Sequence, residues 1–415
     1  VGSEMCIRDS SLLSDGVEKA LDPEIYYEKP LINVIKFACN RCPDNVVKIT
    51  NVCQGCLEHP CMEVCPRHAI TRQNGQAHID QDKCIRCGRC LKECKFNAIV
   101  RLERPCRKAC GMDCIHSDGL GRADIDYSKC TSCGQCMVSC PFGAISDKSQ
   151  IFQTIQAVKS NTPVYVALAP AFVGQFGPEG VPERMRGAFQ RLGFADVYEV
   201  AIGADLCVIE EAADFLEEVP EKHKFMVTSC CPSWSDMVKK LFPQFEKNIS
   251  VAFTPMVLTA RMIKRDHPDC KVVFVGPCVA KRKEVKMDPC VDFTLTFEEV
   301  GSVLAGMDIK IEEAQPFTVL RNSVREAHGF AQAGGVINAV KVYLKEDQDA
   351  SLNTIQVANL TKKNVALLRA YAKTGKAPGQ FIEVMACEGG CVTGPCVHGD
   401  RSAGQKQLLK ELTKY

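Results

Sequence analysis

The chain has 415 residues, 46% of them hydrophobic, which is enough for two or three domains with separate cores. Its 51 basic and 50 acidic residues leave a net charge of +1, so no nucleic-acid partner is expected. No apolar run reaches transmembrane length and no basic-then-apolar start indicates secretion, so we expect a cytoplasmic protein without a membrane span. The first ten residues, VGSEMCIRDS, look like translated sequencing adapter, and we expect residues 1–10 to be a non-native leader.

The unusual feature of the composition is its 27 cysteines. A secreted disulfide framework would be small and loop-rich and would follow a signal peptide. This chain is large, and its cysteines recur at the two- and three-residue gaps that suit metal clusters. We therefore expect iron–sulfur clusters rather than disulfides.

Residues 39 to 145 contain an internal repeat in which a cysteine is followed by three residues, a small residue and isoleucine. The instances are CPRHAI, CKFNAI, CGMDCI and CPFGAI. In such repeats the last cysteine lies too far along the chain for its own cubane and ligates the neighbouring cluster. A zinc interpretation would need closed sets of four ligands, often including histidine. The first two repeats predict two [4Fe–4S] sites, formed by Cys53, Cys56, Cys61 and Cys94, and by Cys84, Cys87, Cys90 and Cys65.

The second pair of repeats is irregular and leaves alternatives open. Its regular set, Cys130, Cys133 and Cys136, needs a distant fourth ligand, which the alignment gives as Cys110, with Cys114 as the alternative. The partner set lacks two early cysteines, which the clip ACNRC supplies. We expect a further cubane there, with a small zinc site or an empty site as alternatives. Its ligands would be Cys39, Cys42, Cys106 and Cys140. A row of cubanes predicts transfer of single electrons to a buried centre.

From about residue 148 onward, apolar strands alternate with amphipathic helices, which predicts an α/β fold. Strands are expected within 163–172, where a turn follows at Pro170, and at 196–203, 224–230, 271–278 and 380–387. Helices are expected within 182–194, where Gly193 ends the helix, and at 204–218, 254–266 and 361–375. Three of these strands run directly into a cysteine. Since sites in α/β folds gather at strand ends, the loops carrying Cys230, Cys231, Cys278, Cys387 and Cys391 are expected to converge.

The segments TSCCPSW, GPCVAKRKE and EVMACEGGCVTG resemble the three signature loops of the [FeFe]-hydrogenases, and APAF and GADLCVIEEA also resemble that family. The resemblance runs in order from about residue 39 to 400. The cysteine-rich N-terminal part is similar to the ferredoxin-rich, monomeric, anaerobic branch called group B. The resemblance implies α+β ferredoxin-like cluster repeats followed by an α/β catalytic domain, with its cofactor between two lobes. The expected domains are 30–100 and 101–147, both ferredoxin-like, and 148–415, the catalytic domain.

The implied cofactor is an H-cluster, a [4Fe–4S] cubane joined through a cysteine sulfur to a two-iron subsite with CO, cyanide and azadithiolate ligands. Three to four additional [4Fe–4S] clusters would accompany it. By motif position the cubane ligands are Cys231, Cys278, Cys387 and Cys391, of which Cys391 would bridge to the two-iron unit.

The resemblance also implies roles for residues around this cofactor. Cys230 would carry protons at the azadithiolate, because a thiol pKa shifts readily, and Glu211, Ser250 and Asp214 would relay them onward. Lys281 would pair with a cyanide ligand and Glu284 would brace the loop. The remaining pocket residues would be Ala169, Pro170 and Met385. The alternatives are a small packed thiol for Cys230, a solvated helix face for the acids and core packing for Met385.

Three departures from the family pattern alter the expected pocket: Gly276 stands where methionine is usual, Met256 where glutamine is common, and Cys396 is additional. The function implied is ferredoxin hydrogenase, an enzyme for reversible H2 oxidation and proton reduction. Its partners would be a ferredoxin-type electron carrier and the hydrogenase maturation proteins. The alternative is a non-catalytic relative, either an iron–sulfur assembly scaffold or an H2 sensor. The intact Cys230–Cys231 pair argues against the assembly scaffold, which typically lacks the first of these cysteines.

Overall fold

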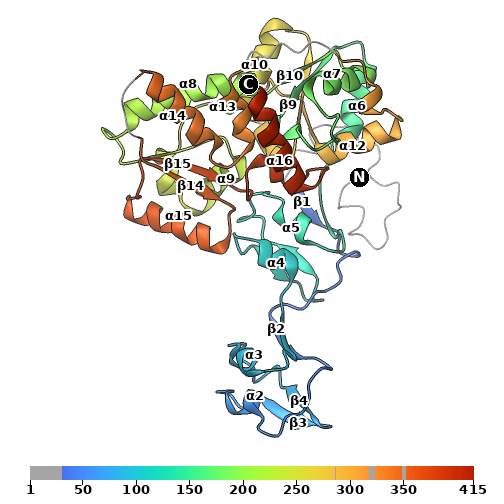
Figure 1. The fold of residues 1–415 in the computed structure, drawn as a ribbon, viewed down its shortest axis with the longest axis vertical. Helices are drawn as coiled ribbons and strands as arrows, with labels where there is room; N and C mark the ends of the chain where they lie inside the picture. Colours follow the sequence, from blue (N-terminus) through green and yellow to red (C-terminus); the bar gives the residue numbers. More distant parts are fainter. Residues whose placement is uncertain (1–29, 286, 317–322, 348–351) are drawn as a thin grey trace.

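The computed structural model describes residues 30–285, 287–316, 323–347 and 352–415. The expected leader at residues 1–10 lies outside these ranges. In Figure 1 a small cysteine-rich module projects from a larger body, and the remaining cysteine repeats lie between the two.

The four repeats found in the sequence fold alike, which confirms the alignment on the terminal isoleucine. Each has a short helix ahead of its last cysteine: α2 (Pro60–Glu63), α3 (Arg89–Glu93), α4 (Pro105–Ala109) and α5 (Gln135–Ser139). Each isoleucine then begins a strand: β3 (Ile70–Gln73), β5 (Ile99–Leu102), β6 (Ile115–Ser117) and β8 (Ile145–Asp147). All four isoleucines are buried, Ile70 and Ile99 in a small core of the projecting module and Ile115 and Ile145 in a core shared with the larger body.

The strands of the repeats pair as antiparallel ribbons. β2 (Val46–Ile49) pairs with β5, β3 with β4 (Gln76–Ile79), and β6 with β7 (Ala123–Ile125). The projecting module, residues 46–102, has a small apolar core of its own around Val47, Ile70, Ile79 and Ile99. We call it the distal module, and Figure 1 shows it at the lower end of the molecule.

The strand β1 (Ile32–Val34) crosses between the expected ferredoxin-like domains. It pairs with β8, so that Ile32 lies opposite Asp147. With the expected boundary at residue 100, β1 would belong to the first ferredoxin-like domain. It pairs instead with β8, a strand of the second. Residues 30–45 therefore run along the second pair of repeats before the chain enters the distal module.

Beyond residue 148 the strands form two separate parallel sheets, and the expected α/β fold is confirmed. One sheet has the order β10-β9-β12-β13, with strands β9 (Val164–Leu168), β10 (Asp196–Glu199), β12 (Lys271–Gly276) and β13 (Phe293–Thr296). The other has the order β11-β15-β14, with strands β11 (Met226–Val227), β14 (Thr354–Ala358) and β15 (Phe381–Met385). The sequence indicates all of these strands except β13 and β14.

Helices pack around both sheets. Those expected from the sequence are α7 (Pro182–Arg191), α8 (Ala201–Glu218), α10 (Pro255–Asp266) and α15 (Lys362–Thr374). The others are α6 (Ile151–Lys159), α9 (Pro232–Leu241), α11 (Lys281–Val285), α12 (Phe297–Gly306), α13 (Arg325–His328), α14 (Gly335–Asp347) and α16 (Arg401–Glu411). Gly375, with φ +61°, caps α15 in a left-handed conformation that glycine adopts without strain.

The second pair of repeats shares a core with the body, unlike the distal module. Met112 and Ile115 belong to the same buried cluster as Trp234 and Ile382. A buried charge also crosses this boundary, because Arg282 on α11 is fully buried and pairs with Asp147 at the end of β8 and with Glu299 on α12. Such contacts hold these repeats firmly against the two sheets.

Candidate functional site

The cysteines of the three signature segments meet where strands from both sheets end. Cys231 precedes α9 after β11, Cys278 follows β12, and Cys387 and Cys391 follow β15. The thiol of Cys387 feels the charges of Cys278, Cys391 and Cys231, so the four expected ligands lie together. Burial raises the pKa of Cys278 to about 11, with Cys231 adding to the effect. Burial thus favours the protonated form of these thiols, and a metal that binds them must displace the proton.

The adjacent thiols of Cys230 and Cys231 are both buried but differ in the groups around them. Burial raises the pKa of Cys231, but backbone N–H groups at Trp234 and Ala386 and the charge of Lys281 counteract the rise. Burial also raises the pKa of Cys230, and its charged neighbours, Cys207 and Glu211 foremost, raise it further. Burial outweighs these opposing groups at Cys231, but they make a thiolate there less costly than at Cys230, where the largest contributions all favour the neutral S–H group.

A series of polar groups leads from Cys230 toward the surface along α8. Glu211 is fully buried, and its Oε1 accepts hydrogen bonds from the Ser229 backbone N at 3.3 Å and the Ser229 hydroxyl at 3.4 Å. Burial raises the pKa of this carboxyl to about 8, and Ser250, which lies close to it, opposes the rise. Asp214 is half-buried and accepts a hydrogen bond from the backbone N of Val251, whose side chain is 83% exposed. The expected relay residues are thus neighbours, and Ser229, which the sequence analysis did not single out, joins them.

The remaining expected pocket residues lie in the same region. Lys281 Nζ and Glu284 Oε2 form an ion pair at 2.6 Å, with both side chains about nine-tenths buried, and Thr254 donates a hydrogen bond to Glu284. Burial alone would lower the pKa of Lys281, but Glu284 and the nearby thiols raise it above its usual value. Ala169 and Pro170 are buried just after β9, and Met385 is buried at the end of β15.

The three departures from the family pattern each have a defined place. A Cβ atom on Gly276 would come within 2.7 Å of the Phe274 ring, so that ring fills the space beside the strand end. Met256 is 1% exposed and begins α10 together with Pro255. Cys396 is also buried, beside Arg282 and Asp147.

The two cysteine sets of the distal module separate as the repeat spacing predicts. Cys61 is close to Cys53, Cys56 and Cys94. Cys90 is close to Cys84, Cys87 and Cys65, and these four line one cavity. The exchange of the last cysteine between the two repeats is therefore present in the fold.

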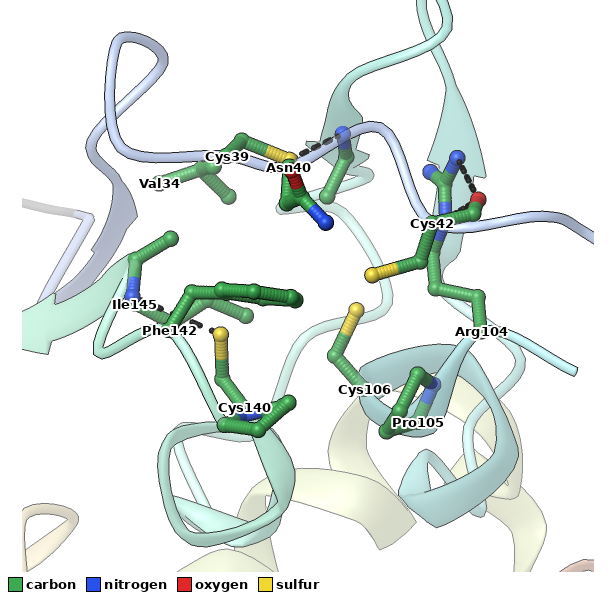
Figure 2. A pocket seen from close by; sticks show the side chains of 13 residues that line it. Val34, Cys39, Asn40, Cys42, Arg104, Pro105, Cys106, Cys140, Phe142 and Ile145 are labelled. Carbon is green, nitrogen blue, oxygen red and sulfur yellow. Dashed lines mark hydrogen bonds between the residues drawn. The ribbon is translucent and has the colours of Figure 1, made fainter.

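Figure 2 shows the irregular set, in which Cys39, Cys42, Cys106 and Cys140 face a common cavity. Three separate stretches of the chain supply them, and Arg104 fixes one of these stretches by donating to the Cys42 carbonyl at 3.0 Å. The backbone N of Ala123 donates to Cys39 Sγ at 3.3 Å. Such N–H donors to sulfur are usual around cluster ligands.

The last set lies between this cavity and the strand-end cysteines. Cys136 is close to Cys130, Cys133 and Cys110. The Cys110 and Cys114 sulfurs are 3.3 Å apart, and hydrogen bonds from Cys114 lower the pKa of both Cys110 and Cys130. The single S–H of Cys114 can donate to one of these sulfurs at a time, which is a supporting role beside ligands.

This last set adjoins the strand-end cysteines directly. Cys133 is close to Cys231 and Cys387, and Gln135 Nε2 donates to Cys387 Sγ at 3.8 Å. Gln135 and Cys207 were not identified from the sequence, because neither belongs to a spacing pattern. Within the described residues, no three His, Cys, Asp or Glu side chains lie close enough to hold a single metal ion. In a cubane, by contrast, each cysteine holds a different iron.

Paired cysteine sets that lead to strand-end cysteines between two parallel sheets define an iron–sulfur electron-transfer protein. Residues 162–395 match the family described as iron only hydrogenase large subunit, C-terminal domain, and residues 76–99 and 123–146 match 4Fe-4S binding domains. The family match covers more than half of the chain, so the protein belongs to the iron-only, or [FeFe], hydrogenase family.

Individual relatives agree with this assignment. The chain is 28% identical to iron hydrogenase 1 of Clostridium pasteurianum over 92% of its own length and 75% of that protein. It is 24% identical to the human nuclear prelamin A recognition factor over 55% of its length and 62% of that protein. A structure of a variant of the [FeFe]-hydrogenase HydA1 of Chlamydomonas reinhardtii has the same fold, with a TM-score of 0.51 at 19% identity, covering 64% of this chain and 88% of that one. No helix in the described ranges is long and apolar enough to cross a membrane.

Proposed function

We propose that the protein is a ferredoxin hydrogenase that oxidises H2 and reduces protons reversibly. The observation that carries the proposal is the meeting of Cys231, Cys278, Cys387 and Cys391 at strand ends, with Cys230 beside them. These four thiols would hold the cubane of an H-cluster between two lobes, and Cys391 would also hold its two-iron unit. When bound, that cofactor supplies the H2-cleaving and proton-reducing chemistry.

In this proposal the chain's own residues hold the cofactor and shield it. Lys281, kept charged by Glu284, would bind a cyanide ligand, and Ala169, Pro170 and Met385 would line the pocket and exclude water. A buried cation that keeps its charge is expensive unless an anion faces it, and Glu284 is the carboxylate that the structure places against Lys281. The cyanide would be a second anionic partner of the Lys281 ammonium.

Protons would pass between this site and the surface along α8. Cys230 would hold a proton next to the cofactor, and Glu211, Ser250 and Asp214 would exchange it with solvent. A carboxyl whose pKa is about 8 gains and loses protons readily near neutral pH, as a relay requires. Ser229 supports the route by holding Glu211 in place.

Electrons would pass through four further [4Fe–4S] clusters held by the cysteine sets described above. Cys110, rather than Cys114, would complete the set of Cys130, Cys133 and Cys136, because Cys114 lies within hydrogen-bond distance of Cys110 Sγ and near Cys130, where it can support these ligands. A ferredoxin-type carrier would exchange electrons with the distal module. The compact cysteine-rich arrangement supports a group B-like enzyme, and its maturation proteins would install the two-iron unit. An anaerobic cytoplasm suits such thiolate clusters, which need a reducing environment.

A second candidate is a non-catalytic iron–sulfur protein. The human relative supports it, because its name describes recognition of prelamin A rather than hydrogen chemistry. This candidate needs only a cubane on the strand-end cysteines and no proton route at Cys230.

An infrared spectrum of the protein, produced together with hydrogenase maturation proteins, separates the two candidates. A hydrogenase should show CO and cyanide bands, and a Cys391→Ala variant should lose them because the bridging sulfur is gone. If the wild-type protein contains its clusters but shows no such bands after maturation, the enzyme proposal is wrong and the non-catalytic candidate stands.

A further inference from the structure

The two cysteine sets of the distal module differ in the charge of the residues around them. The stretch from residue 83 to 95, which holds the set completed by Cys65, contains five Lys or Arg and one Glu. The stretch from residue 53 to 65 contains two Glu and no Lys or Arg. The whole chain is nearly neutral, so this basic concentration is local.

The cations form a rim around one cavity. Arg67, Arg86 and Arg89 line the cavity together with Cys65, Cys84, Cys87 and Cys90. Lys92 lies three residues after Arg89 on α3 and therefore shares its face. We call these four residues, Arg67, Arg86, Arg89 and Lys92, the basic rim. All four are exposed, and none forms an ion pair with any residue that the structure describes.

Neutralisation of cluster charge does not explain the rim. Both sets of the distal module present four thiolates, so both clusters would carry similar negative charge. If the rim served only to balance that charge, the set of Cys53, Cys56 and Cys61 would need as many cations. Only Arg72, beside Gly55, and Lys95, after Cys94, stand near it among the described residues, together with the acidic Glu58 and Glu63. The rim is therefore suited to something outside the chain.

The rim also has the other features of a protein contact. Cys87 is exposed, so the cluster there would lie at the surface, within short range of a docked partner. Ile85 is 58% exposed between Cys84 and Arg86 and offers an apolar contact inside the ring of charge. The distal module projects from the body, so a carrier can approach it without meeting the catalytic domain. Small contacts of this kind are typical of transient electron-transfer complexes.

We propose that the basic rim is the docking surface for an acidic electron-carrier protein, and that electrons enter and leave through the cluster on Cys65, Cys84, Cys87 and Cys90. This inference rests on the proposed electron-transfer function. It specifies the site and the charge of the partner, which that function leaves open. Complementary charge mainly accelerates encounter and makes it depend on ionic strength.

The test compares two variants of the full, cluster-loaded protein with matched changes in charge. One is Arg86→Glu, Arg89→Glu, Lys92→Glu in the rim. The other is Lys363→Glu, Lys373→Glu, Lys376→Glu, which reverses three exposed lysines on or next to α15 in the body. The probe is a bacterial two-cluster ferredoxin of strongly negative net charge. Its binding is measured by calorimetry with both proteins oxidised, at low and high salt.

The rim variant should bind this ferredoxin at least about tenfold more weakly at low salt, and the difference should shrink as salt rises. The α15 variant should bind within about twofold of wild type. Ferredoxin-linked H2 activity should fall with binding in the rim variant, while activity with a viologen dye stays at the wild-type level. Equal binding by the two variants, or salt-independent binding by wild type, would overturn the docking surface.

The calorimetric result does not depend on hydrogen chemistry. If wild type binds ferredoxin through the rim but shows no viologen-linked H2 activity, the docking surface stands and the hydrogenase proposal fails. If viologen-linked activity is normal and the rim variant binds ferredoxin normally, the hydrogenase proposal stands and the docking surface fails. Iron content equal to wild type in both variants confirms that the clusters are intact, and a loss confined to the rim variant would mean that the rim serves the cluster instead.

Discussion

At the scale of single residues, the doubled cysteine separates two chemical tasks. Cys231 has backbone N–H donors and a lysine nearby, which stabilise a sulfur anion. Cys230 faces the acidic group of Glu211 and the thiol of Cys207, which disfavour an anion there. Of these two adjacent residues, Cys231 is thus the better suited to bind a metal and Cys230 the better suited to keep a proton.

The Cys230→Ala variant tests this division. It should keep wild-type iron content, because Cys231 and the other ligands remain, but lose about 10²- to 10⁴-fold in H2 turnover with a viologen dye. The control is Cys207→Ala, which removes a buried thiol from the same surroundings without interrupting the proposed proton route. Full turnover in Cys230→Ala would make Cys230 a packing residue.

Glu211 gives a prediction for stability against pH. Its folded pKa of about 8 lies above the ordinary value of 4.5, so between these values the folded chain keeps a proton that the unfolded chain releases. Wild-type stability should therefore fall as pH rises through this window, by at most about 1.4 kcal/mol per pH unit. Glu211→Gln removes this titration, so its unfolding midpoint should rise relative to wild type from about pH 5 to 8.

The measurement for Glu211→Gln is anaerobic thermal unfolding at several pH values. Glu217→Gln is the control on the same helix, since the Glu217 side chain is 73% exposed and its ion pair with Lys222 lies at the surface. Its midpoint should differ from wild type by a small amount that does not change with pH. A pH-independent difference for Glu211→Gln as well would show that Glu211 is ionised in the folded protein.

At the scale of elements, the sequence predicts those strands and cysteine sets that depend on a local pattern of residues. The apolar runs before Cys230, Cys278 and Cys387 identify β11, β12 and β15, and the repeat spacing identifies the exchange of Cys65 and Cys94. Each of these signals lies within a few tens of residues.

Contacts between distant segments are what the sequence does not reveal. The pairing of β1 with β8 joins residues more than a hundred positions apart, and the contact of Gln135 with Cys387 spans a still longer separation. Neither strand has an alternation that specifies its partner, and a single glutamine carries no periodic signal. Burial of Cys207 beside Cys230 depends likewise on how α8 packs against β11.

The loop before α5 shows how closely two elements must approach. Gly134 has φ +78°, and a Cβ atom there would lie 2.5 Å from the Pro395 side chain. Gly134→Ala should therefore push the loop that carries Cys133 away from the strand-end cysteines and slow electron transfer between the two cluster sites. Rapid freezing after exposure to H2, with the reduced clusters followed by electron paramagnetic resonance, measures this transfer.

The control for Gly134→Ala is Gly143→Ala in the same repeat. Gly143 also has positive φ, +59°, but a Cβ atom there would meet nothing within 4 Å. Both substitutions add backbone strain of about 1 kcal/mol, and only the first adds a clash. Equal electron-transfer rates in the two variants would show that the contact with Pro395 does not determine the distance between the Cys133 loop and the strand-end cysteines.

At the scale of the whole molecule, the cysteine sets form one route between the distal module and the two sheets. β2 begins four residues after Cys42 and β5 ends four residues before Cys106, so the set in Figure 2 lies at the root of the distal module. Cys136 in the next set is close to Cys106. A cluster at the root would therefore connect the distal clusters to those beside the body.

The Cys39→Ala variant tests this connection, since Cys39 contributes only to the root set. It should lose about four irons per chain, one cubane, while the other sets stay filled. H2 should then still reduce the clusters beside the body, but reduction of the distal clusters should slow sharply because the gap left is too long for efficient electron transfer. Cys290→Ser is the control, a half-buried cysteine whose nearest charged neighbours are Asp288 and Arg261 rather than other thiols. Unchanged iron content in Cys39→Ala would mean that no cubane occupies the root, and that electrons reach the body by another route.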